Sequence, residues 1–312
     1  MLILNRTQIV SLLPQVDLIG SLEQGFVDYS QGKCIVPPVG ELLLERGEVH
    51  IKYGCIRDER FYVIKIASGF YQNPQLGLAS SNGLMQLFEQ KTGQLAAILL
   101  DEGLLTDVRT AVAGAVCAKY LAPKDVDCIG IIGTGTQAKL QAEYVSSIVG
   151  CRTIRVWGRN QQNVVEYQRQ LEGLGFCVLI ADSVQQLCHD SRLIITTTPS
   201  SEPIIKAEWI KPGTHITAVG SDTTEKQELD SQLLAKADLL IADSKEQCQH
   251  RGEIAKAFSG NHIRMEEVSE LGEVIAKGMG RAEDEHITIA DLTGVAVQDI
   301  KIAESIFLAA QG

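Results

Sequence analysis

The sequence lacks the features that would mark a membrane, secreted or nucleic-acid-binding protein. No apolar run in its 312 residues reaches the roughly 18–20 residues that a bilayer-spanning helix needs. The first residues show no basic segment followed by a long apolar one, so we expect no signal peptide. Lys and Arg number 28 against 39 Asp and Glu, a net charge of −11. Because nucleic-acid-binding proteins gather Lys and Arg, we expect neither a nucleic-acid nor a membrane partner.

Spacings typical of metal sites and disulfide frameworks are also missing. The eight cysteines form no C-x-x-C pair, and the six histidines form no H-x-x-x-H or H-E-x-x-H pattern. Several cysteines fall within apolar, strand-like runs. We therefore predict buried free thiols in a reducing cytoplasm and no protein-bound metal.

The most informative feature that is present is a glycine loop. An apolar run, residues 129–132, leads into Gly133-x-Gly135-x-x-Ala138 and then into a helical pattern. Gly133 would make the tight turn, Gly135 would let the backbone approach a pyrophosphate, and Ala138 would let helix and strand pack closely. A helix N-terminus at this point would also attract phosphate. The pattern predicts a dinucleotide site, and the alternative is a glycine-rich turn in another α/β sheet. The predicted contacts in the loop are Gly133, Thr134, Gly135, Thr136 and Gln137.

The second strand of this domain bears on which cofactor is used. NAD enzymes of this fold hold the ribose 2′-OH with an acid near the end of that strand, whereas NADP enzymes place an arginine there. Residues 153–158 carry no acid in that place, and Arg159 follows them. We therefore expect NADP(H) to be preferred, with NAD(H) possible if Arg159 is only a surface charge. Asn160, Thr197 and Thr198 complete the predicted cofactor contacts.

The position of the loop predicts two domains, because more than a hundred residues precede it in a chain too long for one core. Residues 12–29 indicate an amphipathic helix, residues 34–100 are strand-rich with a hairpin at 84–100, and residues 105–119 indicate a helix. From residue 128 strands and helices alternate, which predicts a doubly wound parallel sheet of the Rossmann type. The expected strands are 128–133, 153–157, 176–181, 192–197, 214–219 and 238–242. The expected helices are 136–148, 161–173, 183–189, 224–236 and 246–257.

A final helix, residues 297–309, is expected to return to the N-terminal part of the chain. The predicted fold class is α/β, with a Rossmann sheet beside a discontinuous α+β domain. The predicted boundaries are 1–122 with 295–312 for the α+β domain and 123–294 for the Rossmann domain.

Several motifs together resemble the ornithine cyclodeaminase/mu-crystallin family, and the resemblance covers essentially the whole chain. They are Lys65, residues 93–97, Leu105-Thr-Asp-Val-Arg-Thr-Ala111, residues 133–138, Val219-Gly-Ser-Asp222 and Asp291-Leu-Thr-Gly294. The resemblance implies a homodimer paired through the N-terminal domain, which would also bind substrate. Members include ornithine cyclodeaminase, alanine dehydrogenases, ketimine reductases and Δ1-pyrroline-2-carboxylate reductases. Their reactions pass through an imine at the α-carbon of a small amino acid, with hydride moving to or from the nicotinamide.

The resemblance also implies roles for three residues. Arg109 matches an arginine that grips the substrate carboxylate, and Lys65 matches a lysine near that carboxylate and the reacting nitrogen. Asp222 matches an acid/base residue at the end of the fifth Rossmann strand. The plainer alternatives are an exposed helix arginine, an outward-pointing strand lysine and an N-cap for a helix starting near residue 224.

Two departures from the family pattern affect the substrate. Pro37-Pro38-Val39 stands where members often have Pro-Arg, with an arginine that is a further carboxylate ligand. His50 falls at or near a glutamate that holds the substrate amine in cyclodeaminases. His50 and Lys52 would share one strand face and could restore positive charge.

We expect an NAD(P)H-dependent reductase of a small α-imino acid, with Δ1-pyrroline-2-carboxylate to L-proline as the leading example. Arg109 and Lys65, with His50 and Lys52 nearby, would bind the substrate, and Asp222 would supply the proton. The alternatives are ornithine cyclodeaminase, which turns over no net NAD, and a non-catalytic, NADPH-binding, crystallin-like protein.

Overall fold

The computed structural model describes residues 1–70 and 72–312, which form two compact units. Unit 1 contains residues 1–109 and 295–312, and unit 2 contains residues 110–294. The C-terminal segment therefore belongs to the same unit as the N-terminal part. The division falls inside helix α3 (Leu104–Leu121), whereas the sequence analysis put it after residue 122. The difference arises because the first turns of α3 contact unit 1: Arg109 donates a hydrogen bond to Gln298.

Unit 1 is built on a seven-stranded sheet in the order β1-β7-β6-β5-β4-β2, with β3 paired to β4. All its pairs are antiparallel except β1 with β7. The predicted hairpin is present as β6 and β7. The strands are β1 (Leu2–Asn5), β2 (Cys34–Ile35), β3 (Gly40–Leu44), β4 (Gly47–Ile56), β5 (Phe61–Gly69), β6 (Ser81–Glu89) and β7 (Leu95–Leu100).

The N-terminal helix prediction is wrong at its start. Instead of one helix over residues 12–29, the chain forms α1 (Arg6–Leu12), a 3₁₀ turn, η1 (Leu13–Gln15), and α2 (Leu18–Ser30). Pro14 lies in the first turn of η1, where its missing N–H breaks the helical hydrogen-bond ladder. Asp17 then starts α2 by accepting a hydrogen bond from the Gly20 N–H. A second short 3₁₀ turn, η2 (Asn73–Leu76), precedes β6.

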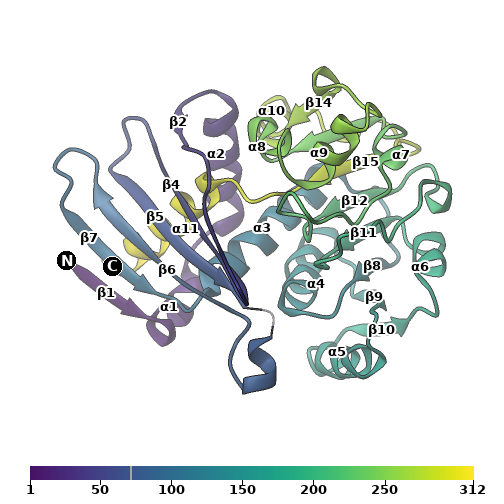
Figure 1. Cartoon of the computed structure of the whole chain (residues 1–312), viewed down its shortest axis with the longest axis horizontal. Helices are drawn as coiled ribbons and strands as arrows, with labels where there is room; N and C mark the ends of the chain where they lie inside the picture. Colours follow the sequence, from purple (N-terminus) through teal and green to yellow (C-terminus); the bar gives the residue numbers. More distant parts are fainter. Residues whose placement is uncertain (71) are drawn as a thin grey trace. The chain divides into compact units, whose positions relative to one another are not determined.

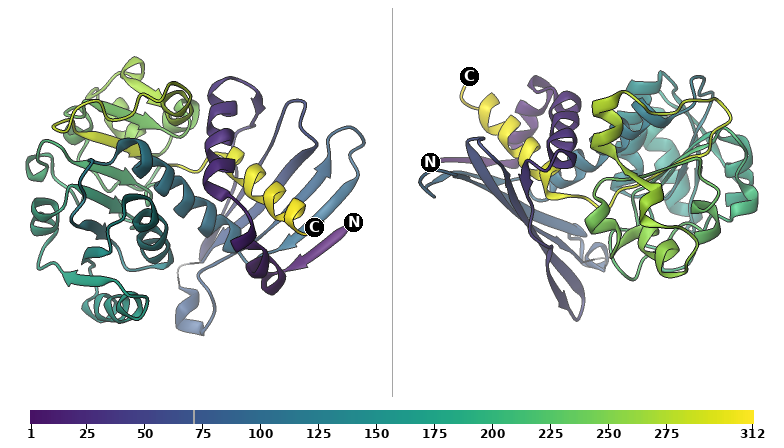
Figure 2. Two further views of the ribbon diagram at one scale, coloured as in Figure 1. Left: turned by 180° about the vertical axis from the view of Figure 1, so that it is seen from behind. Right: turned by 90° about the horizontal axis from the view of Figure 1, so that it is seen from above.

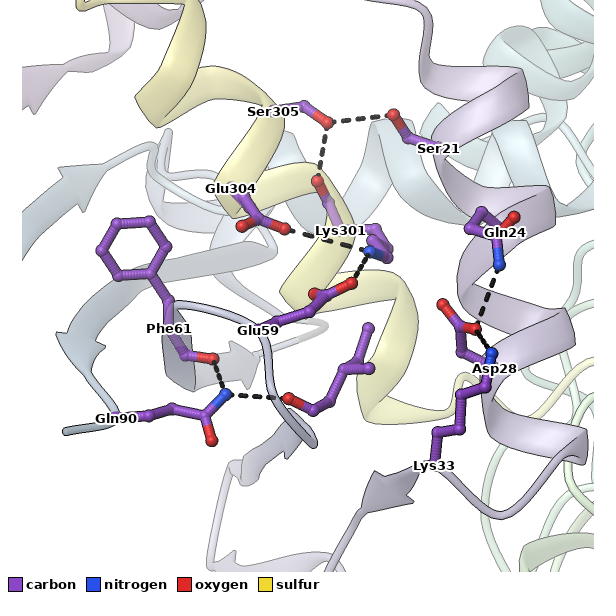
Figure 3. Close-up of polar contacts among 11 residues, drawn as sticks. Ser21, Gln24, Asp28, Lys33, Glu59, Phe61, Gln90, Lys301, Glu304 and Ser305 are labelled. Carbon is purple, nitrogen blue, oxygen red and sulfur yellow. Dashed lines mark hydrogen bonds and ion pairs between the residues drawn. The ribbon is translucent and has the colours of Figure 1, made fainter.

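The last helix, α11 (Ala296–Ala309), lies with α2 on one face of this sheet (Figure 2). It buries Ile302 and Ile306 completely in the core. Polar contacts around it are drawn in Figure 3: Lys301 Nζ lies 2.7 Å from Glu59 Oε1, and Ser305 Oγ lies 3.2 Å from Ser21 Oγ. Apolar burial and these contacts explain why the chain end returns to unit 1.

Unit 2 contains an eight-stranded, fully parallel sheet in the order β10-β9-β8-β11-β12-β15-β13-β14 (Figure 1). Its strands are β8 (Ile129–Ile132), β9 (Thr153–Trp157), β10 (Cys177–Ile180), β11 (Leu193–Thr196), β12 (His215–Ala218), β13 (Leu239–Ala242), β14 (Val268–Glu270) and β15 (Thr288–Asp291). Besides α3, its helices are α4 (Thr136–Val149), α5 (Gln161–Gly173), α6 (Val184–Asp190), η3 (Ala207–Trp209), α7 (Ser231–Leu234), α8 (Lys245–Cys248), α9 (Gly252–Ser259), η4 (Met265–Glu267) and α10 (Leu271–Lys277). The doubly wound parallel fold class is confirmed.

Three details of unit 2 differ from the expected elements. The predicted helix 224–236 shrinks to α7, and residues 221–230 are irregular. The predicted helix 246–257 is broken before Gly252, whose φ of 85° lies in the left-handed region. The strands β14 and β15 and the helix α10 were not predicted, and β15 inserts between β12 and β13.

All eight cysteines are free thiols, and Cys177 is exposed rather than buried. Within residues 1–70 and 72–312, no helix is long and apolar enough to cross a membrane. Over the same residues, no group of three or more His, Cys, Asp and Glu side chains could hold a metal ion.

Candidate functional site

A buried ion cluster forms in unit 1 where β5, α3 and α11 meet. Lys65 Nζ donates to Asp299 Oδ1 at 3.0 Å and lies 3.0 Å from Oδ2, and Arg109 Nε lies 3.2 Å from Oδ1. All three side chains are buried. We call Lys65, Arg109 and Asp299 the Asp299 cluster. Both cations that the family resemblance assigned to a substrate carboxylate are thus brought to one protein carboxylate.

Arg109 is held at two points of its planar guanidinium group. Besides the Nε contact with Asp299, its Nη1 donates to Gln298 Oε1 at 2.8 Å. A guanidinium group has five N–H donors, and the Nη1 bond to Gln298 uses one of them, while the Nε contact with Asp299 is an ion pair. The orientation of the group is therefore set by α11, while the donors that remain can bind a planar carboxylate in a bidentate manner.

The charge on Lys65 depends on its neighbours. Burial lowers the pKa of Lys65 below its ordinary value of 10.5, and the positive charges of Arg109 and Lys52 lower it further. The Asp299 carboxylate acts in the opposite direction and raises the pKa. The cluster therefore holds a lysine whose protonation depends on Asp299.

The two additional cations predicted on β4 differ in their surroundings. Lys52 lies directly opposite Lys65 in the β4–β5 pair and is buried. His50 lies opposite Ala67, and its Nε2 is 3.1 Å from Glu41 Oε1 on β3. Lys52 therefore adds its charge to the surroundings of Lys65, whereas the ring of His50 contacts the Glu41 carboxylate.

Sequence reasoning missed Gln298, Asp299 and Asp101. Asp101 is buried, and its Oδ2 accepts the Leu105 N–H at 2.7 Å at the start of α3. Burial raises the pKa of Asp101 to about 6. The signal that could have revealed Asp299 is a charged residue on the buried side of an apolar helix, which is costly unless it is paired.

In unit 2, the glycine loop joins β8 to α4 where the strand order reverses. Gly133 has a φ of 120°, and its N–H donates to the Trp157 carbonyl at 2.9 Å. A Cβ at Gly133 would collide with the Thr197 hydroxyl, which itself donates to the Ile132 carbonyl at 3.1 Å. Thr134, Thr136 and Gln137 complete this turn and the first residues of α4. The loop therefore requires glycine at position 133.

Gly135 shows the opposite situation. It is the N-cap residue of the 14-residue helix α4, and no side chain caps the helix there. A Cβ at Gly135 would meet no atom within 4 Å. Uncapped N–H groups beside open space at the carboxyl edge of a parallel sheet fit the pyrophosphate of a dinucleotide.

The residues after β9 have two different roles. Asn160 accepts the N–H groups of Gln162 and Asn163, so it is the N-cap of α5. Arg159 is exposed at the carboxyl end of β9, the position from which an arginine could reach a ribose phosphate.

Asp222 lies in the irregular segment that follows β12. Its Oδ1 is 2.7 Å from Lys226 Nζ, and its side chain remains 37% exposed. The alternative that Asp222 caps a helix near residue 224 is wrong, because the next helix begins at Ser231 and is capped by Asp230. Asp222 is thus a partly exposed carboxylate at the sheet edge where ligands bind.

Comparison with known proteins agrees with the motifs quoted from the sequence. The sequence model of the ornithine cyclodeaminase/mu-crystallin family matches residues 1–312. The uncharacterized cyclodeaminase y4tK of Sinorhizobium fredii is 39% identical over 318 residues, covering 100% of this chain and 96% of its own length.

Two solved structures are similar over the full length of the chain. An archaeal alanine dehydrogenase dimer with bound NAD has a TM-score of 0.90 at 33% identity, covering 100% of this chain and 96% of its own. The Thermococcus litoralis Δ1-pyrroline-2-carboxylate reductase, in complex with NADH and L-proline, has a TM-score of 0.92 at 29% identity, covering 100% and 98%. The three relatives carry names of three different reactions.

Proposed function

The chain belongs to the ornithine cyclodeaminase/mu-crystallin family, and we propose that it is an NAD(P)H-dependent reductase of a small α-imino acid. Δ1-Pyrroline-2-carboxylate, reduced to L-proline, is the leading candidate substrate. The observation that carries this proposal is the Asp299 cluster. Its two buried cations share one protein carboxylate, so a net positive charge is left to attract the carboxylate of a substrate. The proline-bound T. litoralis relative supports a cyclic substrate.

Each residue has a defined role in the proposed reaction. Arg109 and Lys65 bind and orient the substrate carboxylate, with Lys52 and His50 adding positive charge on β4. The cofactor, when bound, supplies the hydride for the imine carbon. Asp222 donates a proton to the imine nitrogen, so that hydride and proton together convert C=N into CH–NH. Orientation matters because the reacting atoms must approach to about 3–3.5 Å.

The glycine loop from Gly133 to Gln137, with Thr197 and Thr198, would hold the nicotinamide dinucleotide. Arg159 favours NADP(H), whereas the similar structures contain NAD or NADH. Arg159→Ala should raise the KM for NADPH far more than the KM for NADH. An equal effect on both would remove the basis for the NADP(H) preference.

A second candidate is ornithine cyclodeaminase, and the y4tK relative is named as an uncharacterized cyclodeaminase. That reaction releases ammonia from ornithine with no net change in NAD. The absence of a glutamate at position 50 argues against it, because a free δ-ammonium group would lose its partner.

The deciding experiment offers Δ1-pyrroline-2-carboxylate with NADPH and, separately, with NADH, beside an ammonia assay with ornithine and NAD. Stoichiometric oxidation of reduced cofactor would establish the reductase. Ammonia and proline from ornithine without cofactor turnover would establish the cyclodeaminase. Cofactor binding without either activity would favour the non-catalytic protein. Asp222→Asn should lower kcat of the reductase by about 10²–10⁴-fold.

We also propose that the protein is a homodimer paired through the outer face of the unit 1 sheet. Ile51, Tyr53 and Ile66 are at least 37% exposed on the face of β4 and β5 that points away from Lys52 and Lys65. Neighbouring apolar side chains on two paired strands form a patch of the kind that marks protein interfaces. The archaeal relative is itself described as a dimer.

A further inference from the structure

Glu228 is a buried carboxylate with three hydrogen-bond donors around it. Its side chain is completely buried in unit 2, in the segment between β12 and α7. Oε1 accepts the Thr198 N–H at 2.6 Å, and Oε2 accepts the Thr196 hydroxyl at 2.7 Å and the Gly220 N–H at 2.9 Å. Neither the glycine loop nor the family motifs pointed to this residue.

These donors come from the ends of two neighbouring parallel strands. Thr196 is the last residue of β11, and Thr198 lies just after that strand. Gly220 lies just after β12. A Cβ at Gly220 would collide with the Thr198 backbone, so the two segments approach closely at this point. Glu228 therefore joins the segment after β11 to the segment after β12 at the edge where such sheets bind ligands.

The same carboxylate closes the base of the segment that carries Asp222. Its bond to Gly220 brings the two ends of residues 220–228 together. Inside that segment Ser221 Oγ donates to the Lys226 carbonyl at 2.9 Å, and Lys226 pairs with Asp222. Asp222 is thus held from its own segment, and the base of the segment is held by Glu228.

Glu228 is itself fixed by a second buried acid. Glu253, at the start of α9, accepts the Glu228 N–H at 2.7 Å and the Leu229 N–H at 3.0 Å. Burial raises the pKa of Glu228 to about 7, while the donors from Thr196, Thr198 and Gly220 act in the opposite direction. As a carboxylate Glu228 has acceptor sites for all three donors, and an amide in its place would have only one oxygen to offer them.

We propose that Glu228 is a positioning residue. It fixes the segment after β11, which contains Thr198, relative to the segment after β12, which contains Asp222. This inference rests on the proposed function, in which Thr197 and Thr198 contact the cofactor and Asp222 supplies the proton. Glu228 touches neither substrate nor cofactor in this role. Its effect on the reaction passes through the backbone at Thr198 and Gly220.

The test is Glu228→Gln in the full-length protein, with NADH affinity measured by fluorescence and kcat and KM measured with Δ1-pyrroline-2-carboxylate. We expect the Kd for NADH to rise and kcat to fall, each about tenfold or more, because one amide oxygen cannot accept all three donors. The KM for the imino acid should change by less than about threefold, because the substitution leaves the Asp299 cluster untouched. Thr196→Val removes one donor only and should show the same pattern with smaller changes, which keeps the test valid if Glu228→Gln does not fold.

Asp238→Asn is the matched control. Asp238 Oδ2 also accepts a backbone N–H, that of Ile287 at 2.8 Å, but at the amino ends of β13 and β15. This variant should retain the wild-type Kd, kcat and KM. A purely structural role of Glu228 would lower the melting temperature and leave the Kd and kcat of the folded variant unchanged, and that result would overturn the proposal. A rise in KM as large as the fall in kcat would overturn it as well.

Failure of the proposed function would look different. If Asp222→Asn kept full activity, Asp222 would not be the proton donor. The NADH affinity of Glu228→Gln would still test the role of Glu228 at Thr198. If the wild-type protein reduced no imine but bound NADH, the NADH affinity of Glu228→Gln would still support or overturn the role at Thr198.

Discussion

Asp299 is the residue on which the proposed substrate site depends most directly. It contacts Lys65 and Arg109 from a helix near the chain end, and it raises the pKa of a lysine that burial lowers. Burying two like charges together is costly unless a carboxylate lies between them. The protein thus holds Lys65 and Arg109 close together before any substrate arrives.

Asp299→Asn should change the pH dependence of substrate binding. In the proposed site the protonated form of Lys65 attracts the substrate carboxylate, so its contribution is present at low pH and is lost as pH rises through the lysine pKa. Without the Asp299 charge that pKa falls, and the loss should occur at lower pH. We expect the KM to rise by about tenfold at mildly acidic to neutral pH, up to the wild-type Lys65 pKa of about 7, which corresponds to about 1.4 kcal/mol. Measuring KM against pH for both proteins checks this.

Asp28→Asn is the control for Asp299→Asn. Asp28 is also a buried carboxylate of unit 1, paired with Lys33 at 2.8 Å on the partly exposed end of α2. It should leave the pH dependence of KM unchanged. Identical KM profiles for wild type and Asp299→Asn would show that Asp299 does not govern the charge on Lys65.

At the scale of elements, the β8–α4 turn contains two glycines that are needed for different reasons. Gly133 is required by the fold, because it combines a φ of 120° with close contact to Thr197. Gly135 has open space in the direction of a Cβ, so the fold itself would accept a side chain there. The sequence pattern treats the two alike, and the structure separates them.

This difference predicts opposite outcomes for two substitutions. Gly133→Ala should lower the free energy of unfolding by about 1–3 kcal/mol, because its backbone conformation strains a side chain. Gly135→Val should lower stability by no more than about 1 kcal/mol, because valine is a poorer N-cap than glycine, yet weaken NADH binding by occupying the space of the pyrophosphate. Urea denaturation and NADH titration of both variants measure these effects. Normal NADH affinity in Gly135→Val would contradict a pyrophosphate at this turn.

The strand β12 contains a histidine that links stability to pH. His215 is completely buried between Thr217 and Thr288, and burial together with Arg281 lowers its pKa from 6.5 to about 3. Because the folded-state pKa is lowered, the neutral side chain contributes fully above pH 6.5. That contribution is lost as pH falls from 6.5 towards 3, since the unfolded chain takes up the proton first.

His215→Gln should remove this part of the pH dependence. The free energy of unfolding of the wild type should fall by up to about 1.4 kcal/mol per pH unit below 6.5 through this group alone. The variant should show a shallower slope in urea denaturation series between neutral and mildly acidic pH. His262→Gln, at an exposed position, should keep the wild-type slope. Equal slopes in wild type and His215→Gln would show that His215 is not buried in its neutral form.

At the scale of the whole molecule, the proposed dimer face is the outer surface of the unit 1 sheet. Ile66→Lys places a charge opposite Ile51 in the centre of the apolar patch. We expect the variant to elute as a monomer where the wild type is a dimer, in size-exclusion chromatography with light scattering. Val165→Lys, at a 51% exposed apolar position of α5, is the control and should leave the mass unchanged. A dimer of Ile66→Lys as stable as the wild type would place the interface elsewhere.

Local patterns in the sequence were sufficient to predict the glycine turn after β8 and the parallel sheet. A turn with positive φ needs glycine at one position, and strand and helix periods differ, so these features are visible in short windows. The same reasoning failed at residues 224–236 and 246–257, where short-range helical patterns gave way to tertiary contacts. It also failed at residues 12–29, where Pro14 and the capping residues Asn5 and Asp17 set the helix ends.

The sequence by itself determined the elements whose causes are local: the glycine loop, the arginine after the second strand and the helix that contains Arg109. Only the tertiary structure decided which distant residues meet. Lys65 and Asp299 are 234 positions apart, β15 inserts between β12 and β13, and Glu228 joins two strand ends. The physical reason is that a buried charge needs an oppositely charged partner, which can come from any part of the chain that folds next to it. Sequence periodicity shows which face of an element is buried, but not which neighbour that face packs against.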